Sequence, residues 1–506
     1  MNTLGGTTLR RFSSILRTII PLTVVALALW YGFGEYRAGR LALPGLPARQ
    51  AATSTTLPAT RAAKPAKPTT TPRAINPATA PMATAAPVTA AQPSLDTDPA
   101  LGLDPARAGV LNRYADGDYA RTVADARAYL ADHPTDPLVS LYRGDALQRQ
   151  VGKPTVTIGV SVPTTGGNAQ SGEAILQGVN LAVSNVNRAG GVRGRRVLVL
   201  VRNDAQDRAQ AVEAASRFVA QPEVLAVIGP VGSSATLAAA DVYNSAGLSQ
   251  VAPTATDDRV AQAGDYTFRM APGNTPQGRA LARLAQRSGF TRVPVYSNPK
   301  DEYSKSLAAA FVVEATSLGV SAPSFTYQPG GLPTQDGFDT FTDSPKPNAA
   351  FISGTYDDVT RLAQAFRKRG LKVPLLSGDA AYSQKLLQVG GAAVEGLTLV
   401  SFFHATSSVG STAAFTAQFE AVYAGGTPNA RAAQAFDATR AVLEAIRRAP
   451  TLSRDGIQAG LKAITPAKPT PGVTAPIGFV NNGAAGRPFI VIKVKNGQLL
   501  ATDVVK

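Results

Sequence analysis

From Thr155 onward, short runs of β-branched and other apolar residues alternate with longer stretches that have a helical period. Three of the runs are TVTIGVSVP, RVLVLVRND and VLAVIGP. The stretch after the first run, EAILQGVNLAVSNVNRAGG, places Ile175, Val179 and Val183 on one face of a helix. The alternation predicts an α/β fold with right-handed crossovers, in which helices cover both faces of a parallel sheet.

A second set of the same kind begins at RVPVYSN and continues through SLAAAFVVEATSLG, AAFISG, VTRLAQAFRKRG and VPLLSGD. Two such sets predict two lobes, each built on a doubly wound parallel sheet. Because doubly wound sheets bind ligands at the carboxyl ends of their strands, we expect a ligand site in the cleft between the lobes.

The amino-terminal part of the chain has a different pattern. Residues 18–34 carry no charge and follow three arginines, which predicts a transmembrane anchor within residues 1–40, a cytoplasmic amino terminus and an extracytoplasmic, periplasmic bulk. A cleaved signal peptide is the alternative interpretation. Residues 41–103 are rich in Ala, Pro and Thr and predict an extended linker.

Residues 104–150 return to a helical pattern, in which Gly117 separates two helices and Pro134 ends the second. We expect a short helical hairpin there, which resembles one tetratricopeptide unit. One such unit cannot bury its apolar face alone, so we expect it to pack on its neighbour or on a partner.

Composition excludes several classes of function. The formal net charge is +16, but residues 1–97 hold ten Lys/Arg against two acids, and the other 409 residues hold 40 bases and 32 acids without a dense basic run. We therefore expect no nucleic-acid binding. The chain has no cysteine and only two histidines, His133 and His404, so we expect no thiolate chemistry, no metal site and no cofactor.

The loops after the predicted strands hold mostly hydroxyl residues, glycines and single acids, as in GPVGSS, APTAT, SNPKDEY, SGTY and SGD. A phosphate-binding loop requires a lysine that is missing, and no dinucleotide fingerprint follows the first strand. Ser233 lacks the flanking glycines of a nucleophile elbow. The loops therefore favour a binding protein over an enzyme.

The same loops suggest what binds. Ser233 or Ser234 begins a predicted helix, whose free N–H groups attract an anion, and Thr256 adds a hydroxyl. Asp379 of the other lobe pairs with an ammonium group. Together they match an α-amino acid, with Tyr303 and Tyr356 as walls. The alternative is that Ser233 is only a helix cap, Asp379 a turn residue and the tyrosines surface aromatics.

Residues 155 to about 500 resemble the leucine/isoleucine/valine-binding family of type I periplasmic solute-binding proteins. The resemblance is carried by the first strands and helices and by VIGPVGSSATLAAADVYNSAGLSQVAPTATDDRV, YTFRMAPGNTPQGRALA, FRKRGLKVPLLSGDA and AAQAFDATRAVLEAI. It implies lobes joined by three crossings, near Pro272, Ser401 and Gly478, that close on the ligand. The implied lobes are about 155–272 with 402–478, and 273–401 with 479–506.

The resemblance also implies ligand contacts by a Ser-Ser turn, an Ala-Thr turn, an acid and two aromatic residues. These positions are Ser233, Ala255, Thr256, Asp379, Tyr303 and Tyr356. The chain departs from the family near Ser171, where an aromatic residue is common, and at Gln206 and Gly232, where some relatives have a disulfide.

We therefore expect a membrane-tethered, extracytoplasmic protein that captures a small amino acid or amide for an ABC importer and contacts its permease subunits. A ligand-sensing ectodomain and an interaction protein that regulates cell-wall enzymes through the helical module are the alternatives.

Overall fold

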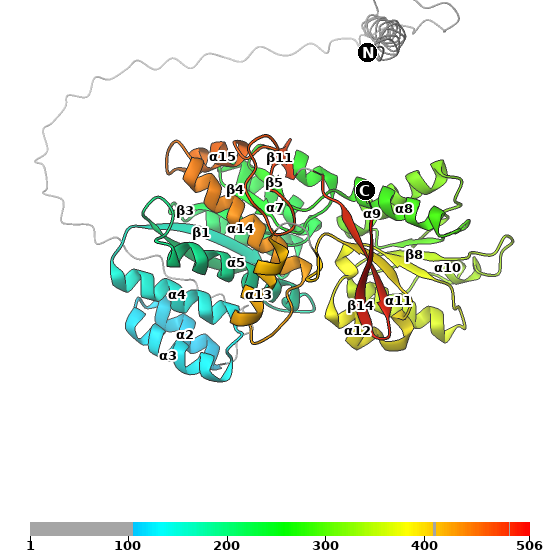
Figure 1. Cartoon of the computed structure of the whole chain (residues 1–506), viewed down its shortest axis with the longest axis horizontal. Coiled ribbons are helices and arrows are strands. Elements are labelled where there is room, and N and C mark those ends of the chain that lie inside the picture. The colour runs from blue at the N-terminus through cyan, green and yellow to red at the C-terminus, as the bar shows by residue number, and fades with distance from the viewer. Residues whose placement is uncertain (1–104, 408–410, 485, 506) are drawn as a thin grey trace, which may run out of the picture. The chain divides into compact units, whose positions relative to one another are not determined.

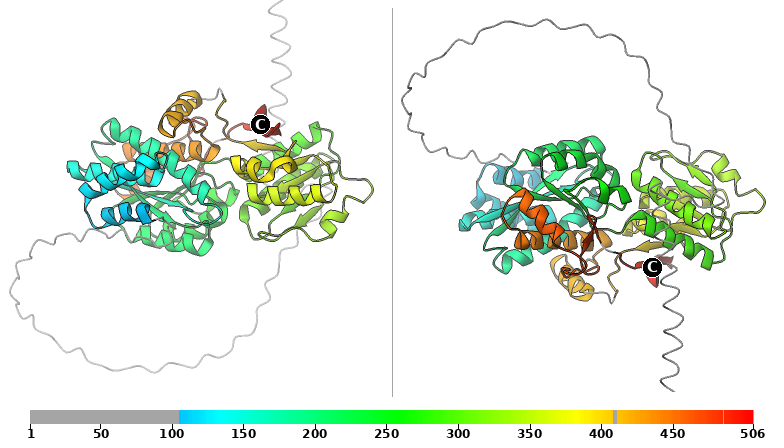
Figure 2. Two further views of the ribbon diagram at one scale, coloured as in Figure 1. Left: turned by 90° about the horizontal axis from the view of Figure 1, so that it is seen from below. Right: turned by 90° about the horizontal axis from the view of Figure 1, so that it is seen from above.

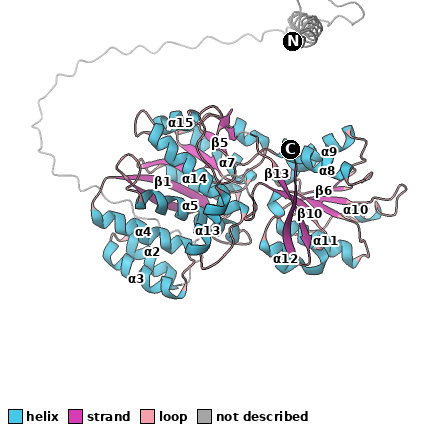
Figure 3. Ribbon diagram, viewed as in Figure 1, coloured by secondary structure: helices cyan, strands magenta, loops and turns pink. Residues whose placement is uncertain are grey.

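Two seven-stranded sheets organise the part of the chain that the computed structural model describes, which is residues 105–407, 411–484 and 486–505 (Figures 1 and 3). The predicted anchor at 18–34 and the linker at 41–103 lie outside these ranges. Within them, every helix is too short or too polar to serve as a membrane span.

The first sheet forms lobe 1 and has the strand order β11-β12-β5-β4-β3-β1-β2. Its strands are β1 (Thr155–Val162), β2 (Arg196–Asn203), β3 (Val224–Ile228), β4 (Ser249–Ala252), β5 (Thr267–Arg269), β11 (Phe479–Val480) and β12 (Gly483–Ala484). Its helices are α5 (Ala169–Arg188), α6 (Arg208–Val219), α7 (Ser233–Ser245), α13 (Thr412–Val422), α14 (Ala430–Arg448), α15 (Arg454–Lys462) and the 3-10 helix η2 (Asp258–Gln262).

The second sheet forms lobe 2 and has the order β14-β13-β10-β9-β8-β6-β7. Its strands are β6 (Val295–Ser297), β7 (Ser324–Thr326), β8 (Ala350–Ser353), β9 (Leu375–Ser377), β10 (Thr398–Ser401), β13 (Phe489–Lys495) and β14 (Gln498–Val505). Its helices are α8 (Asn274–Arg287), α9 (Glu302–Ser317), α10 (Asp336–Asp339), α11 (Tyr356–Lys368), α12 (Gln384–Gly390), and the 3-10 helices η3 (Asp379–Ala381) and η4 (Gly391–Val394).

Each sheet is parallel in its centre and antiparallel at one edge, so the expectation of purely parallel sheets needs correction. β11 pairs antiparallel with β12, and β13 pairs antiparallel with both β10 and β14. The sequence Asn496-Gly497 forms the turn between β13 and β14, with positive φ at both residues (53° and 67°), as a tight hairpin requires.

The chain passes between lobes after β5, after β10 and after β12. The last passage follows Ala484, later than the expected position near Gly478.

Helices cover both faces of the first sheet. Because β1 lies between β2 and β3, right-handed crossovers place α5 on one face and α6 and α7 on the other. α14 packs against α5 (Figure 1). Gly178 of α5 permits this close approach, since a Cβ there would lie 2.1 Å from the carbonyl oxygen of Ala432. The contact fixes the first turn of α14, which carries Arg431.

Ahead of the lobes, the structure describes residues 105–154, and this part contains three helices, α2 (Pro105–Ala115), α3 (Tyr119–Asp132) and α4 (Pro137–Val151). The expected two-helix hairpin is therefore corrected. Asp136 caps α4 by accepting hydrogen bonds from the backbone N–H groups of Leu138 (2.9 Å) and Val139 (3.0 Å). In the views of Figures 1 and 2 the three helices lie beside lobe 1, where α4 packs against α5 and β2.

Candidate ligand-binding site

A cavity between the lobes is lined by residues from both of them. Lobe 1 contributes the loops after β1, β2, β3 and β4 and the start of α14, and lobe 2 contributes the loops after β6, β8 and β9. The lining residues are Asn168, Ser171, Gln206, Val231, Gly232, Ser233, Thr254, Asp301, Tyr303, Thr355, Tyr356, Asp379, Ala380, Ala430, Arg431 and Gln434.

On the lobe 1 side, Ser233 is the first residue of α7. Its Oγ accepts hydrogen bonds from the backbone N–H groups of Thr256 (3.2 Å) and Asp257 (3.1 Å). Both lone pairs of the hydroxyl are then in use, which leaves its proton to donate to a ligand. The first N–H groups of α7 have no intrahelical partner, as at the start of any α-helix. The preceding Gly232 has no side chain that could cap them. This corner of the cavity is suited to an anion.

On the lobe 2 side, Asp379 is held by two neighbours. Its Oδ1 accepts hydrogen bonds from Gln277 Nε2 (2.9 Å) and from the Tyr303 hydroxyl (3.1 Å). The Gln277 amide oxygen accepts from the Asp379 N–H (2.9 Å), so the carboxyl group cannot turn freely. Burial raises the pKa of Asp379, against the opposing effects of Gln277, the Arg431 charge and Tyr303. The second carboxylate oxygen is left for a cation such as an ammonium group.

Tyr356 and Arg431 connect the two lobes at the cavity. The Tyr356 hydroxyl of α11 donates to the carbonyl oxygen of Gly167 in lobe 1 at 3.2 Å. The Arg431 guanidinium of lobe 1 donates to the carbonyl oxygens of Ala380 (3.1 Å) and Tyr382 (3.2 Å) in lobe 2. Burial lowers the pKa of Arg431, and the nearby Asp379 opposes that effect.

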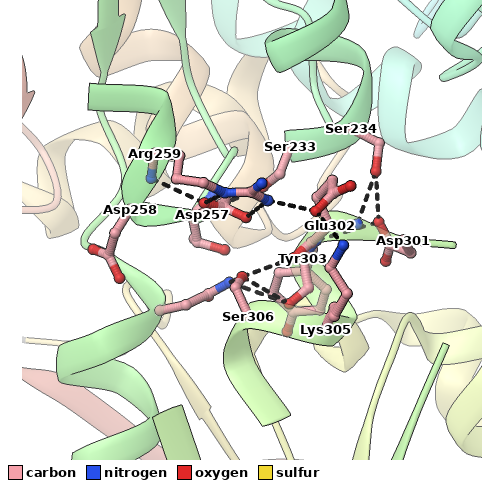
Figure 4. A network of polar contacts seen from close by, with 12 residues as sticks. Ser233, Ser234, Asp257, Asp258, Arg259, Asp301, Glu302, Tyr303, Lys305 and Ser306 are labelled. Atoms are coloured by element: carbon pink, nitrogen blue, oxygen red, sulfur yellow. Dashed lines mark hydrogen bonds and ion pairs between the residues drawn. The ribbon is translucent and has the colours of Figure 1, made fainter. Parts of the chain in front are cut away.

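A second group of contacts joins the lobes beside the cavity (Figure 4). Ser234 Oγ donates to Asp301 Oδ1 (3.0 Å) and accepts from the Glu302 N–H (3.0 Å). Arg259 of η2 pairs with Asp257 at 2.7 Å and also with Glu302 of α9. Ser234 therefore contacts the opposite lobe and does not line the cavity.

The structure brings together four of the seven residues predicted for the site. Ser233, Tyr303, Tyr356 and Asp379 line the cavity. Ser234, Ala255 and Thr256 are not among the lining residues: the Ser234 side chain bonds to Asp301, and Ala255 and Thr256 are buried in lobe 1. Thr254 lines the cavity instead, and its hydroxyl donates to the Val231 carbonyl oxygen at 2.8 Å.

Sequence reasoning missed Gln206, Arg431 and Gln434. Gln206 lies next to Gly232: a Cβ added to Gly232 would be 3.0 Å from the side-chain amide nitrogen of Gln206. The two positions that some relatives join by a disulfide are therefore adjacent in space. Gln434 is 2% exposed, and its amide nitrogen is one of the buried side-chain atoms of the described residues without a hydrogen-bond partner. An arginine two residues after the Asn429 cap was the only available signal for this part of the site.

Curated relatives match the lobes. The chain is 28% identical to an amino acid binding protein of Pseudomonas aeruginosa over 237 residues, which are 47% of this chain and 63% of that protein. It is 28% identical to Leu/Ile/Val-binding protein homolog 1 of Brucella suis over 252 residues, which are 49% of this chain and 66% of that protein. The chain thus spans just under two thirds of the length of these relatives.

Solved structures match a larger share of this chain. The leucine-binding protein LivK of Thermotoga maritima has 28% sequence identity and a TM-score of 0.64, covering 70% of this chain and 99% of that one. The branched-chain amino acid transporter substrate-binding protein LivJ of Streptococcus pneumoniae, solved with isoleucine, has 26% identity and a TM-score of 0.64, with the same coverage.

The sequence profile of the periplasmic binding protein family matches residues 155–498, which is more than half of the chain. The match takes in every residue that lines the cavity and both sheets up to the start of β14. This family consists of solute-binding proteins and not of enzymes. The chain therefore belongs to the periplasmic binding protein family, with the two-lobed α/β fold of its type I members.

Proposed function

We propose that this protein captures an α-amino acid in the cavity between its lobes as the substrate-binding component of an ABC importer. The observation that carries the proposal is the pair of opposite binding corners. Ser233 and the start of α7 in lobe 1 suit a carboxylate, and Asp379 in lobe 2 suits an ammonium group. An α-amino acid has both groups on one carbon, so it bridges the lobes.

The relatives support the transport role. LivJ of Streptococcus pneumoniae is a branched-chain amino acid transporter substrate-binding protein, and its structure holds isoleucine. We further propose that residues 1–40 anchor the protein, that residues 41–103 tether the lobes in the periplasm and that the lobes dock on permease subunits. The helices at 105–151 then form a module attached to lobe 1.

The first test is a thermal-shift and calorimetric screen of the purified protein with the standard L-amino acids. We expect at least one of them to raise the melting temperature, because a ligand that binds only the folded state stabilises it. The N-acetyl derivative of that amino acid lacks the ammonium charge and is expected not to bind. A screen in which no amino acid binds contradicts the proposal.

The second test is the substitution Asp379→Asn, which keeps the shape and removes the charge. The loss of a buried charge-assisted bond to the ammonium group is expected to weaken binding by about 2 kcal/mol, roughly 30-fold. Asp357→Asn is the matched control, since Asp357 lies in lobe 2 with its side chain 68% exposed. Equal affinities of the Asp379 and Asp357 variants would remove Asp379 from the site.

A further inference from the structure

The cavity has a second polar corner that the carboxylate and ammonium groups of an amino acid do not use. Ser233 and Gln206 lie on the side of α6 and α7, on one face of the first sheet. Asn168 and Arg431 lie at the starts of α5 and α14, on the opposite face. A ligand with its carboxylate at α7 therefore points its remaining part either along the cavity toward α5 and α14 or out of it.

Arg431 brings a positive charge to this second corner. Two of its five N–H groups donate to the carbonyl oxygens of Ala380 and Tyr382. Arg431 forms no direct ion pair with a carboxylate of the described residues, although Asp379 lies near enough for its charge to act on Arg431. It also stands in the first turn of α14, where the helix end is itself positive and disfavours a cation. The corner therefore favours an added anion.

Gln434 and Ser171 add hydrogen-bonding groups beside Arg431. Gln434 is 2% exposed and its amide nitrogen has no partner within the described ranges. Ser171 is 7% exposed and lines the same cavity. A buried donor without an acceptor costs free energy, and an acceptor on the ligand removes that cost.

Few aliphatic side chains belong to the cavity wall. The aliphatic residues of the cavity wall are Val231, Ala380 and Ala430, and the rings of Tyr303 and Tyr356 complete the apolar surface. A branched aliphatic side chain placed against Arg431 and Gln434 would desolvate both without pairing either.

We propose that the ligand is an acidic amino acid whose side-chain carboxylate binds Arg431 and Gln434, while its α-carboxylate binds at α7 and its ammonium group at Asp379. This inference rests on the proposed function. With such a ligand, Arg431, Asp379 and the start of α7 each meet a group of opposite charge.

The test compares L-glutamate, L-aspartate, L-glutamine and L-leucine as probes by calorimetry on the purified protein. Glutamate or aspartate is expected to bind at least ten-fold more tightly than leucine. Arg431→Met keeps the aliphatic stem and removes the charge, and it is expected to weaken binding of the acidic amino acid at least ten-fold more than it weakens binding of leucine. Arg440→Met is the control, because Arg440 is on the same helix and does not line the cavity.

Gln434→Glu is the second variant, since Arg431 also bonds to lobe 2 and its loss can disturb the fold. A carboxylate at 434 repels the ligand carboxylate, so acidic amino acids are expected to lose affinity and glutamine to lose less. Leucine binding more tightly than glutamate and aspartate overturns this inference and leaves the proposed function standing. Binding of no amino acid overturns both, and equal losses in the Arg431 and Arg440 variants overturn the role of Arg431.

Discussion

At the scale of residues, a buried ion pair holds the last passage of the chain onto lobe 1. Asp437 of α14 and Arg487 lie 3.7 Å apart, with side chains 0% and 2% exposed. Asp437 also accepts hydrogen bonds from the N–H groups of Val473 (2.6 Å) and Thr474 (3.0 Å). Burial raises the pKa of Asp437 and lowers that of Arg487, and each charge opposes the shift of the other.

Asp437→Ala is expected to lower the free energy of unfolding by about 3–5 kcal/mol, because Arg487 is left as a buried charge without its partner. Urea denaturation at pH 7 measures the loss. The double variant Asp437→Leu with Arg487→Met replaces both charges by apolar groups and is expected to recover much of it. A single variant as stable as the parent protein would show that the pair contributes nothing.

The candidate site shows which functional residues can be predicted from the positions of the strands in the sequence. Ser233, Tyr303 and Asp379 follow strands β3, β6 and β9 closely, so the rule that ligands bind at carboxyl ends of strands selects them. Arg431 and Gln434 follow no strand, since α14 comes after α13 on the second passage through lobe 1. Their position depends on the packing of α14 on α5, which one sequence does not reveal.

At the scale of elements, α4 covers the edge of the first sheet. β2 is the outer strand, and its backbone donates to side chains of α4: Val199 N–H to Asp145 Oδ2 (2.8 Å) and Val201 N–H to the Tyr142 hydroxyl (3.3 Å). An exposed edge strand leaves such groups unpaired. The helical module thus completes lobe 1, in agreement with the expectation that one helical unit packs on its neighbour.

Asp145 makes this contact sensitive to pH. Burial raises its pKa to about 8, although the Val199 N–H and Arg149 act against the shift. A folded pKa above the unfolded value of about 4 means that the folded protein binds more protons between these values, so stability falls as pH rises through this window. Between pH 5 and 7 the expected loss from this group is about 2 kcal/mol.

Asp145→Asn keeps the acceptor for Val199 and removes the titration. Urea denaturation of both proteins at pH 5 and 7 isolates the effect, because the other titrating groups are shared. We expect the variant to lose about 2 kcal/mol less than the parent protein between these pH values. Parallel pH dependences of parent and variant would contradict a raised pKa.

Local signals explain which elements the sequence predicted. The strand–helix alternation after Thr155 is periodic over many residues and gave the two α/β lobes. The third helix, α4, was missed although Asp136-Pro137 is a helix cap followed by a favourable first residue, because the expected hairpin has its second helix end at Pro134. The antiparallel edge was missed because β13 and β14 form a hairpin at the end of the alternation, where Asn496-Gly497 is the signal.

At the scale of the whole molecule, Glu302 forms a charged contact between the lobes. It stands at the start of α9 and pairs with Arg259 and, at 3.7 Å, with Arg208 of lobe 1, as well as with Lys305 of its own helix at 2.9 Å. Burial acts to raise the pKa of Glu302, but the hydrogen bonds and charges of Lys305 and Arg259 outweigh it and lower the pKa. The carboxylate is therefore ionised at neutral pH and attracts lobe 1.

Glu302→Gln is expected to shift the lobes toward a more open arrangement and to weaken ligand binding up to about five-fold, the scale of a partly exposed ion pair. Because the chain has no cysteine, Gln210→Cys on α6 and Val313→Cys on α9 can carry spin labels that report the distance between the lobes. Glu314→Gln is the matched control, since Glu314 is 15% exposed and pairs with Arg279 and Arg283 inside lobe 2. High salt should reduce the difference between parent and Glu302 variant, because it screens the pair. Identical distance distributions for the two variants at low salt would mean that Glu302 does not hold the lobes together.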